Sequence, residues 1–335
     1  MWFARRRRSR APHSRGAHRG SSGPPTGLAG LPRPVAAVVG GGGVYGATQV
    51  GIGYALEQRG FVPDLVVGTS VGAFNGAVAA AHPGSAARTL ELTWTRLRRR
   101  EVFPFGLPYS RAGLFADAGL RKLITESGLP SRIEDLAVPF IAVATDLASG
   151  DEVRLDRGDL ESALLASSAI PGVLPPVERD GRILVDGGAV AHVPVLAARA
   201  AGAASVVVVA TGPDSWPRTT SAAPRRAEAI AARAGLLMIH HQIQRDLREV
   251  SQQIPTVVLP TGVVSWPAMW DFSHSRQLID AGSRAAGRFL DGLDIRGPGL
   301  YQSDDPQEPP PSVVDGAVAV GSDNPQRTTA SEGTR

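Results

Sequence analysis

The sequence predicts an α/β fold in three layers: a mostly parallel central sheet with helices on both of its faces. Three observations lead to this prediction. Short apolar runs without polar alternation indicate strands that are buried on both sides. Longer helical patterns alternate with these runs, which is typical of parallel strands joined by crossover helices. Glycines follow several of the runs directly, where a strand would pass into a helix.

Each predicted element has its own local reason. A strand is predicted at each short β-branched or apolar run, at residues 35–39, 65–67, 140–145, 182–185, 206–210 and 256–259. A helix is predicted at each longer helical pattern, at residues 44–59, 74–82, 160–168, 225–252 and 273–290. Gly60 ends the first of these helices, and Pro171 stops the third. In the long helix at residues 225–252, the spacing of the apolar positions predicts a stripe that faces the core.

One domain at residues 34–295 holds all of these elements, and no internal repeat divides it. The two ends differ from it in composition. Residues 1–33 are basic and rich in Gly, Pro and Ser, and residues 296–335 are acidic and Pro-rich. Because neither composition can form a packed core, both ends are predicted to be disordered.

The formal net charge of +4 comes from one end of the chain. The first 20 residues carry seven Arg and no acid, whereas the body is nearly neutral. A neutral body without a docking motif argues against a nucleic-acid partner. The Arg-rich end either associates with anionic lipid headgroups or is an inert leader, and the sequence leaves both interpretations open.

Composition excludes several classes of protein and site. The chain has no Cys, which excludes a disulfide scaffold, a thiolate metal site and a cysteine nucleophile. No run approaches the ~18–20 apolar residues of a membrane span. No apolar stretch of signal-peptide length follows the arginines. We therefore expect a cytoplasmic protein whose contact with the inner face of the membrane is peripheral.

A glycine-rich loop at residues 40–46 (GGGGVYG) follows the first predicted strand. Glycines let backbone N–H groups converge on one point, and the start of the next helix adds a positive dipole end, so the loop suits an anion. Three interpretations remain open. Gly41, Gly43 and Gly46 fit a dinucleotide fingerprint with Asp64 as the acid that binds ribose. The loop would also serve as an oxyanion hole, or it is only a tight turn.

A second motif, Gly68-x-Ser70-x-Gly72, lies between a predicted strand and a predicted helix. A nucleophile elbow requires this strand–turn–helix context, because small residues around the serine permit the sharp turn that exposes its hydroxyl group. The helix N-terminus also favours negative charge on the serine oxygen. The alternative is a structural Gly/Ser turn without a chemical role.

A third motif, Asp186-Gly187-Gly188, directly follows the strand at residues 182–185. A carboxylate at this position can reach the crevice where α/β sheets bind ligands, and it can accept a serine proton. Asp-Gly is also a common tight-turn pair, so a structural role is the alternative. Of the seven histidines only His192 has a loop context after a strand, and it is either a helper of this aspartate or a packed loop residue.

Together the three motifs resemble, in order and spacing, the patatin-like phospholipase family. The resemblance covers residues 36–199 and includes the stretches ATDL at 144–147 and SSAIPGVLPP at 167–176. It implies a Ser–Asp dyad with Ser70 as nucleophile and Asp186 as general base. It further implies that the oxyanion hole is formed by Gly41, Gly42 and Gly43. The remaining glycines of the motifs would support the local backbone: Gly46, Gly68, Gly72, Gly187 and Gly188.

The resemblance implies that the chain hydrolyses fatty-acyl esters through an acyl-enzyme. The implied substrates are phospholipids, lysophospholipids or acylglycerols, and neither a metal nor an organic cofactor is expected. The chain departs from the family pattern at Tyr45, where Arg or Lys is common, and at Ala191 and His192, where two Asn are common. These departures leave the contacts to the leaving group and headgroup undetermined.

Two aromatic segments, residues 102–115 and 263–272, are candidates for contact with a lipid surface. The first follows a cluster of arginines, and the alternative of ordinary core packing under a surface loop is slightly favoured for it. The second contains two Trp, which either line an acyl pocket or cover the sheet. Two other functions remain open: a nucleotide-binding oxidoreductase that uses the glycine-rich loop, and an inactive membrane-binding protein of the same family. The oligomeric state is not predicted.

Overall fold

The computed structural model describes residues 27–103, 113–212, 225–263 and 271–303. Most of both predicted tails therefore lies outside the described residues. The same is true of the central parts of the two aromatic segments, at residues 104–112 and 264–270.

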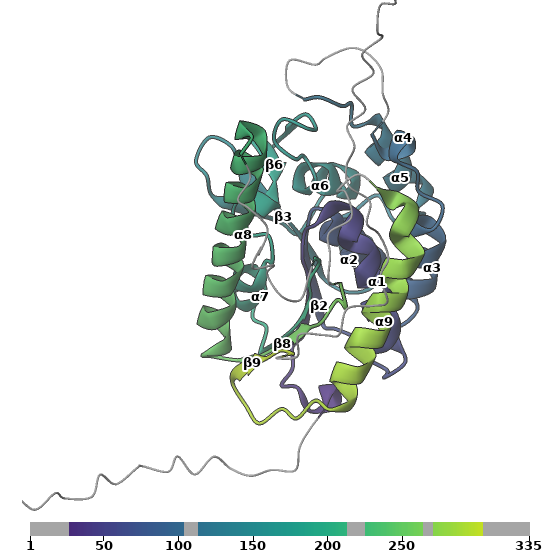
Figure 1. The fold of residues 1–335 in the computed structure, drawn as a ribbon, viewed down its shortest axis with the longest axis vertical. Helices are drawn as coiled ribbons and strands as arrows, with labels where there is room; N and C mark the ends of the chain where they lie inside the picture. Colours follow the sequence, from purple (N-terminus) through teal and green to yellow (C-terminus); the bar gives the residue numbers. More distant parts are fainter. Residues whose placement is uncertain (1–26, 104–112, 213–224, 264–270, 304–335) are drawn as a thin grey trace, which may run out of the picture.

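A single sheet of nine strands forms the centre of the described part of the chain (Figure 1). The strands are β1 Val35–Val39, β2 Leu65–Thr69, β3 Phe140–Asp146, β4 Glu152–Leu155, β5 Val177–Arg179, β6 Arg182–Asp186, β7 Ser205–Val209, β8 Pro255–Leu259 and β9 Gly299–Tyr301. Their order is β5-β6-β3-β2-β1-β7-β8-β9, with β4 paired to β3 beside this path. Within this order, neighbouring strands in the run β3-β2-β1-β7-β8-β9 are parallel. The antiparallel pairs are β3 with β4, β3 with β6, and β5 with β6.

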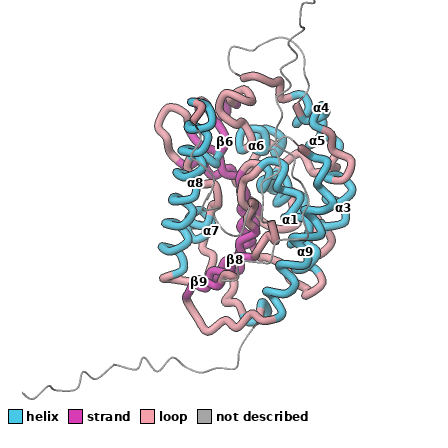
Figure 2. Tube along the Cα trace, in the orientation of Figure 1, coloured by secondary structure: helices cyan, strands magenta, loops and turns pink. Residues whose placement is uncertain are grey.

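Helices cover both faces of this sheet. They are α1 Gly46–Glu57, α2 Val71–Ala81, α3 Ala86–Trp94, α4 Arg99–Val102, α5 Ala118–Glu126, α6 Leu160–Ser167, α7 Val195–Ala200, α8 Ala227–Ser251 and α9 Ser275–Asp291. Figures 1 and 2 show α7 and α8 on one side of the strands and α1, α2, α3 and α9 on the other. The three-layer α/β fold with a mostly parallel sheet is therefore confirmed.

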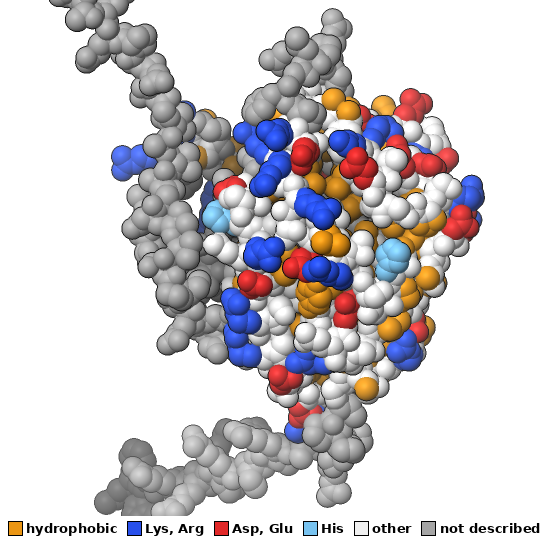
Figure 3. Space-filling view, turned by 90° about the vertical axis from the view of Figure 1, so that its right-hand side faces the viewer, with side chains coloured by type: hydrophobic (Ala, Val, Ile, Leu, Met, Phe, Trp, Pro, Cys, Tyr) orange, Lys and Arg blue, Asp and Glu red, His pale blue; other side chains and the backbone are white. Residues whose placement is uncertain are grey.

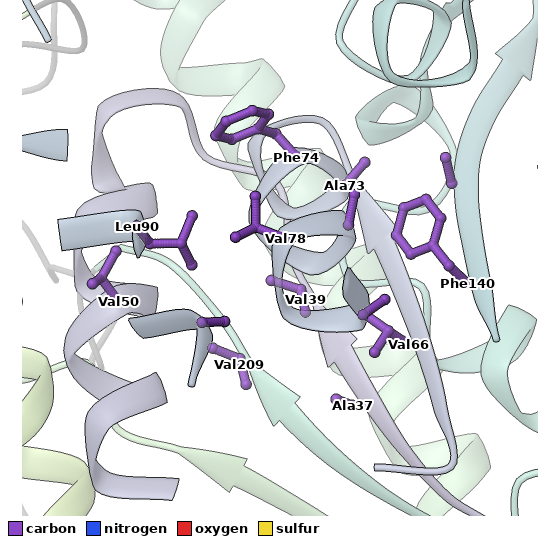
Figure 4. Close-up of a cluster of buried hydrophobic side chains, with 14 of the residues drawn as sticks. Ala37, Val39, Val50, Val66, Ala73, Phe74, Val78, Leu90, Phe140 and Val209 are labelled. Carbon is purple, nitrogen blue, oxygen red and sulfur yellow. The ribbon is translucent and has the colours of Figure 1, made fainter. Parts of the chain in front are cut away.

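The central strands are buried along their whole length, as their lack of polar alternation predicts. Alternate residues of one strand point to opposite faces, so they enter two separate cores. Val39 and Val66 pack with α2, where Figure 4 shows them beside Val78. Val38 and Val67 face the other way, toward α7 and the C-terminal end of α8.

Several elements were missed because the sequence carries little local signal for them. These are the short strands β4, β5 and β9 and the helices α3, α4, α5 and α7. The strand β9 lies beyond residue 295, the predicted end of the domain. It belongs to the sheet because it pairs with β8.

The predicted core-facing stripe of the long helix is wrong for its N-terminal part. Ile230 and Leu237 of α8 are exposed, whereas Leu236, Ile239 and Ile243 of the same predicted stripe are partly buried. None of the helices in the described ranges combines the length and the hydrophobicity of a transmembrane span.

Candidate active site

The three glycine-marked motifs meet at one edge of the sheet. Because β1 and β2 are parallel neighbours, the loop after Val39 and the turn after Thr69 leave the sheet at the same end. The strand β6 arrives antiparallel to β3, with Asp186 opposite Ala144. Since Val143, the residue before Ala144, is paired with Thr69, the aspartate lies two strands away from the serine turn. The sheet thus brings together residues that are more than 100 positions apart in the chain.

Ser70 occupies a strained turn between β2 and α2. Its φ of 56° and ψ of −128° are conformations that a residue with a side chain rarely adopts. The turn is held by the Ser70 N–H, which donates to Ser167 Oγ at 2.9 Å, while Ser167 donates to the carbonyl of Val143 at 2.6 Å. Ser167 belongs to the SSAIPGVLPP stretch, in which the sequence gives it no role of its own, and the structure shows that it anchors the serine turn.

The two glycines of this turn are required by close backbone contacts. A Cβ on Gly68 would lie 2.4 Å from the carbonyl oxygen of Gly72, and a Cβ on Gly72 would lie 2.2 Å from that of Val39. Neither contact involves a flexible side chain that could move away. The spacing of the motif therefore reflects the packing of α2 against the ends of β1 and β2.

Replacing Gly72 with Ala is expected to destabilise the fold by about 2–3 kcal/mol, because the new methyl group would overlap two backbone carbonyl oxygens. Denaturant unfolding followed by circular dichroism measures this change. The matched control is Gly235→Ala in α8, where nothing lies within 4 Å of the added Cβ. There the same substitution should stabilise the helix by up to about 1 kcal/mol. An unchanged free energy of unfolding for Gly72→Ala would contradict the close packing of the turn.

Asp186 is buried at the end of β6, and backbone groups hold it in place. Its Oδ1 accepts the N–H of Gly188 at 2.7 Å, and its own N–H donates to the carbonyl of Ala169 at 2.9 Å. Burial raises the pKa of Asp186 to about 6, although hydrogen bonds from the Ser70 hydroxyl and the Gly188 N–H act in the opposite direction. The carboxylate is thus dry, in contact with the serine and a stronger base than a solvated aspartate.

Gly187 brings the chain close to the neighbouring strand. A Cβ at this position would lie 2.2 Å from the carbonyl oxygen of Val143, so only glycine fits. Since Asp186 is also the N-terminal cap of a short 3-10 helix, Gly187–Ala189, the Asp-Gly pair does form a turn. The structural and the chemical interpretations of this motif are therefore compatible.

The glycines of the glycine-rich loop differ in their contacts: Gly42 and Gly43 line the same cavity as Ser70, whereas Gly41 is hydrogen-bonded to neighbouring segments. The N–H of Gly41 donates to the carbonyl of His192 at 2.9 Å, and the carbonyl of Gly41 accepts the hydroxyl of Thr211. Gly42 and Gly43 have φ values of 150° and 57°, and both line the same cavity as Ser70. This differs from the expectation that Gly41 donates to an oxyanion, because its N–H is already bonded to the carbonyl of His192.

The ring of His192 lies between the glycine-rich loop and the loop that follows Asp186. A Cβ on Gly41 would come within 3.1 Å of the His192 ring, and a Cβ on Gly188 within 3.2 Å. Burial lowers the pKa of His192 to about 4, so the ring is neutral near pH 7. Tyr45 lines the cavity and is almost fully buried, which raises the pKa of its hydroxyl group.

A buried polar network that the sequence analysis missed ties the glycine-rich loop to three helices. Trp94 Nε1 donates to Asn75 Oδ1 at 3.0 Å, and Asn75 Nδ2 donates to Gln49 Oε1 at 2.8 Å and to the carbonyl of Gly46 at 3.0 Å. Gln49 Nε2 completes it by donating to the carbonyl of Gly40 at 2.8 Å. The only sequence signal for this network is the presence of single polar residues in otherwise apolar helices.

Asp64, the acid that would bind ribose in the dinucleotide interpretation, lies far from the glycine-rich loop. Asp64 precedes β2, so it lies at the opposite edge of the sheet from the glycine-rich loop. There it accepts the side chain of Arg33 at 2.6 Å and the N–H of Val35 at 2.7 Å. Among the described residues, no three His, Asp or Glu side chains gather closely enough to hold a metal ion.

Ser70 and Asp186 share a cavity of about 860 Å³. Ser70 and Asp186 line it together with side chains from both helical layers. The layer with α2 contributes mainly apolar groups, among them Phe74, Trp94, Phe103, Leu120, Leu123 and Leu174. From the other layer, α8 contributes Leu236, Met238, Ile239, Ile243 and Leu247. A cavity of this size and lining is suited to a long apolar group held beside a reactive serine.

Comparison with known proteins gives one family match. Residues 37–199 match the family model described as patatin-like phospholipase. The matched segment begins in β1, ends in α7 and contains Ser70, Asp186 and the glycine-rich loop.

Curated relatives match over the same region. The chain is 36% identical over 184 residues to patatin-like phospholipase domain-containing protein 6 of Mus musculus, a match that covers 53% of this chain and 13% of that protein. It is 37% identical over 180 residues to an uncharacterized NTE family protein of Mycobacterium bovis, covering 53% of this chain and 46% of the relative. The chain thus matches less than half the length of either relative.

A solved structure, VipD from Legionella pneumophila, shares 15% sequence identity with the chain, with a TM-score of 0.44. The superposition covers 79% of this chain and 69% of VipD.

Proposed function

Because residues 37–199 belong to the patatin-like phospholipase family, we propose that the chain is a serine lipid acyl hydrolase with Ser70 as nucleophile and Asp186 as general base. The observation that carries this proposal is the buried Asp186 carboxylate, whose raised pKa is partly offset by the neighbouring Ser70 hydroxyl and which lines the same largely apolar cavity as Ser70. The proposed substrates are fatty-acyl esters of a phospholipid, lysophospholipid or acylglycerol.

In the first half of the proposed reaction, Ser70 Oγ attacks the ester carbonyl carbon while its proton passes to Asp186. The carbonyl π electrons move onto oxygen, and the N–H groups of Gly42 and Gly43 stabilise that charge. The ester C–O bond then breaks, and Asp186 returns the proton to the departing alcohol. The acyl group remains bound to Ser70.

In the second half, water attacks the acyl-enzyme and gives a proton to Asp186. When the intermediate collapses, the Ser70 oxygen leaves with that proton, and the fatty acid is released. No step requires a histidine, which agrees with the pKa of His192, because burial lowers it to about 4 and makes the ring a weak base. We assign His192 to the loop instead, where its backbone carbonyl holds Gly41 beside the serine.

The pH profile offers a direct test of the base. Because burial raises the pKa of Asp186 to about 6, the ionised base is present above that pH and is lost as the pH falls through it. We expect kcat/KM for a soluble medium-chain p-nitrophenyl ester to level off above about pH 7 and to fall about tenfold for each pH unit below pH 6. A profile that stays flat down to about pH 4 would contradict the assignment of Asp186 as the base.

Labelling by a fluorophosphonate probe tests the nucleophile and separates the enzyme from an inactive family member. We expect the probe to modify Ser70, as peptide mass spectrometry can show. A panel of phospholipids, lysophospholipids and acylglycerols then identifies the preferred ester. A folded protein that neither reacts with the probe nor hydrolyses any lipid of the panel would favour the inactive membrane-binding alternative.

A further inference from the structure

The N-terminal half of α8 presents apolar side chains to the outside of the protein. From residue 227 to residue 245 the described side chains are exposed or only partly buried, whereas buried residues occur only in the last turns. The large apolar side chains of Ile230, Leu237 and Met238 are 49%, 37% and 73% exposed. An apolar helix surface of this kind marks an interaction site more often than an accident of the fold.

Two of these exposed residues, Ile230 and Leu237, share one face of the helix. Ile230 and Leu237 are seven residues apart, which places them two turns apart on the same stripe. Small exposed residues fill the space between and beside them, at Ala227, Ala231 and Ala234. The cavity-lining residues Leu236, Ile239 and Ile243 are at other positions of the helical period and point inward. The helix therefore has two apolar faces, one toward the cavity and one toward solvent.

Met238 joins the two faces. It is the most exposed of the three large side chains, and it also lines the catalytic cavity. The outer apolar face is thus continuous with the rim of the cavity that contains Ser70. A substrate that moved from this face into the cavity would not have to leave apolar surroundings.

The charges along this half of α8 are mainly positive. Arg225 and Arg226 precede the helix and Arg233 lies within it, against one acid, Glu228, in the first turn. Basic side chains beside an exposed apolar face suit the headgroup region of an anionic bilayer. On the side of the molecule where α3 and α9 lie, basic and acidic side chains are interspersed (Figure 3).

The position of α8 relative to the dyad is set by a contact with the loop that follows Asp186. Gln242 Nε2 donates to the carbonyl of Val190, four residues after Asp186. The C-terminal part of the helix also packs in the same core as α7, through Leu247 and Val250. A surface that bound the N-terminal half of α8 would therefore be held at a defined orientation to Ser70.

We propose that residues 227–241 of α8 dock on the surface of a phospholipid bilayer, so that the mouth of the catalytic cavity faces the leaflet. The outer face formed by Ile230 and Leu237 enters the interfacial region, and the arginines at positions 225, 226 and 233 contact anionic headgroups. This inference deepens the proposed function, because it names the membrane as the source of the lipid. The docking itself does not depend on Ser70 or Asp186.

Vesicle flotation of the double variant Ile230→Ser/Leu237→Ser tests the docking face. The full chain carries Ser70→Ala as well, so that hydrolysis cannot alter the vesicles, which contain phosphatidylcholine with a minor share of phosphatidylglycerol. We expect bound protein to fall about tenfold or more, because two apolar side chains no longer enter the interface. The matched control is Val62→Ser/Leu92→Ser, which changes two other apolar residues that are each 40% exposed. The control should float like the parent.

A fluorescent label gives a second readout that does not depend on affinity. Because the chain has no Cys, Ile230→Cys allows an environment-sensitive dye to be attached at one position. Vesicles should shift the emission of this dye to shorter wavelength, and a dye at Leu92→Cys should not respond. Circular dichroism of all variants verifies that they are folded.

Three outcomes would overturn the proposal: equal flotation of the α8 variant and the parent, an equal loss in the control variant, or a dye at position 230 that is already shielded without vesicles. Shielding that rises with protein concentration would assign the face to a second copy of the chain. Shielding that is independent of concentration would assign it to another segment of the same chain.

The assays also separate this inference from the proposed function. In the otherwise wild-type chain, Ile230→Ser/Leu237→Ser should hydrolyse a soluble ester at the parent rate and vesicle lipid about tenfold more slowly. Flotation without any ester hydrolysis would refute the proposed function and leave the docking face standing. Hydrolysis of vesicle lipid at an unchanged rate would refute the docking face alone.

Discussion

Replacing Ser70 with Ala is expected to lower kcat for ester hydrolysis by about 10⁴-fold or more, because the acyl-enzyme can no longer form. The fold should remain intact, since the anchoring bond to Ser167 uses the backbone N–H of residue 70 and not its side chain. Hydrolysis of a medium-chain p-nitrophenyl ester measures the rate, and loss of fluorophosphonate labelling gives an independent readout. Thermal unfolding verifies that the variant is folded.

The control for this substitution is Ser251→Ala. Ser251 is also a buried serine, but it lies at the end of α8, where its hydroxyl group donates to the carbonyl of Arg248. Its removal should leave both hydrolysis and labelling unchanged. If Ser70→Ala kept most of its activity, another residue would have to be the nucleophile and the proposed dyad would be wrong.

Replacing Asp186 with Asn is expected to lower kcat by about 10³–10⁴-fold, because the amide cannot accept the proton of Ser70. The shape of the site is retained, since the amide oxygen can still accept the N–H of Gly188. Fluorophosphonate labelling should slow in parallel, because the probe depends on the same activated hydroxyl group. The matched control is Asp146→Asn on the neighbouring strand, where the side chain caps the N–H of Ala148. That variant should retain its activity.

Asp186→Asn should also change stability in a direction that depends on pH. Since burial raises the pKa of Asp186 from 3.8 to about 6, the folded state bears a cost for the charged form. This cost is fully present above pH 6 and vanishes below the pKa of the unfolded chain, and its upper bound is about 3 kcal/mol. Urea unfolding should therefore find the Asn variant more stable than the parent at about pH 8 and equally stable near pH 3–4. A variant that is less stable at the higher pH would show that the carboxylate is not destabilised by burial.

The prediction of the fold succeeded where burial leaves a mark on local sequence. Strands such as β1 and β7 lie at the centre of the sheet, so every residue is apolar or small and the run stands out. The strands β4, β5 and β9 lie at or near the edges, with only three or four residues each. Their pairing with a neighbour defines them, and no pattern within three residues can reveal that pairing.

Interpretation of α8 failed for a related reason. The periodic apolar residues of a helix predict an apolar face, but they do not indicate whether the core of the protein, a membrane or a partner covers that face. Leu247 and Val250 are covered by the core, whereas Ile230 and Leu237 are exposed and Leu236 and Ile239 line the cavity. Only the tertiary structure decides which apolar side chains of the helix are covered.

By itself, the sequence determined the fold class, the order of the three motifs and the residue types available for the chemistry. It did so because glycines at strand ends and buried strands are local requirements. Tertiary structure decided that Asp186 meets Ser70 in a dry site and that Asp64 lies at the opposite edge of the sheet. It also decided that the N–H of Gly41 is bonded to the carbonyl of His192. Proximity, burial and the choice of hydrogen-bond partner arise between distant segments, so they exist only once the strands have paired.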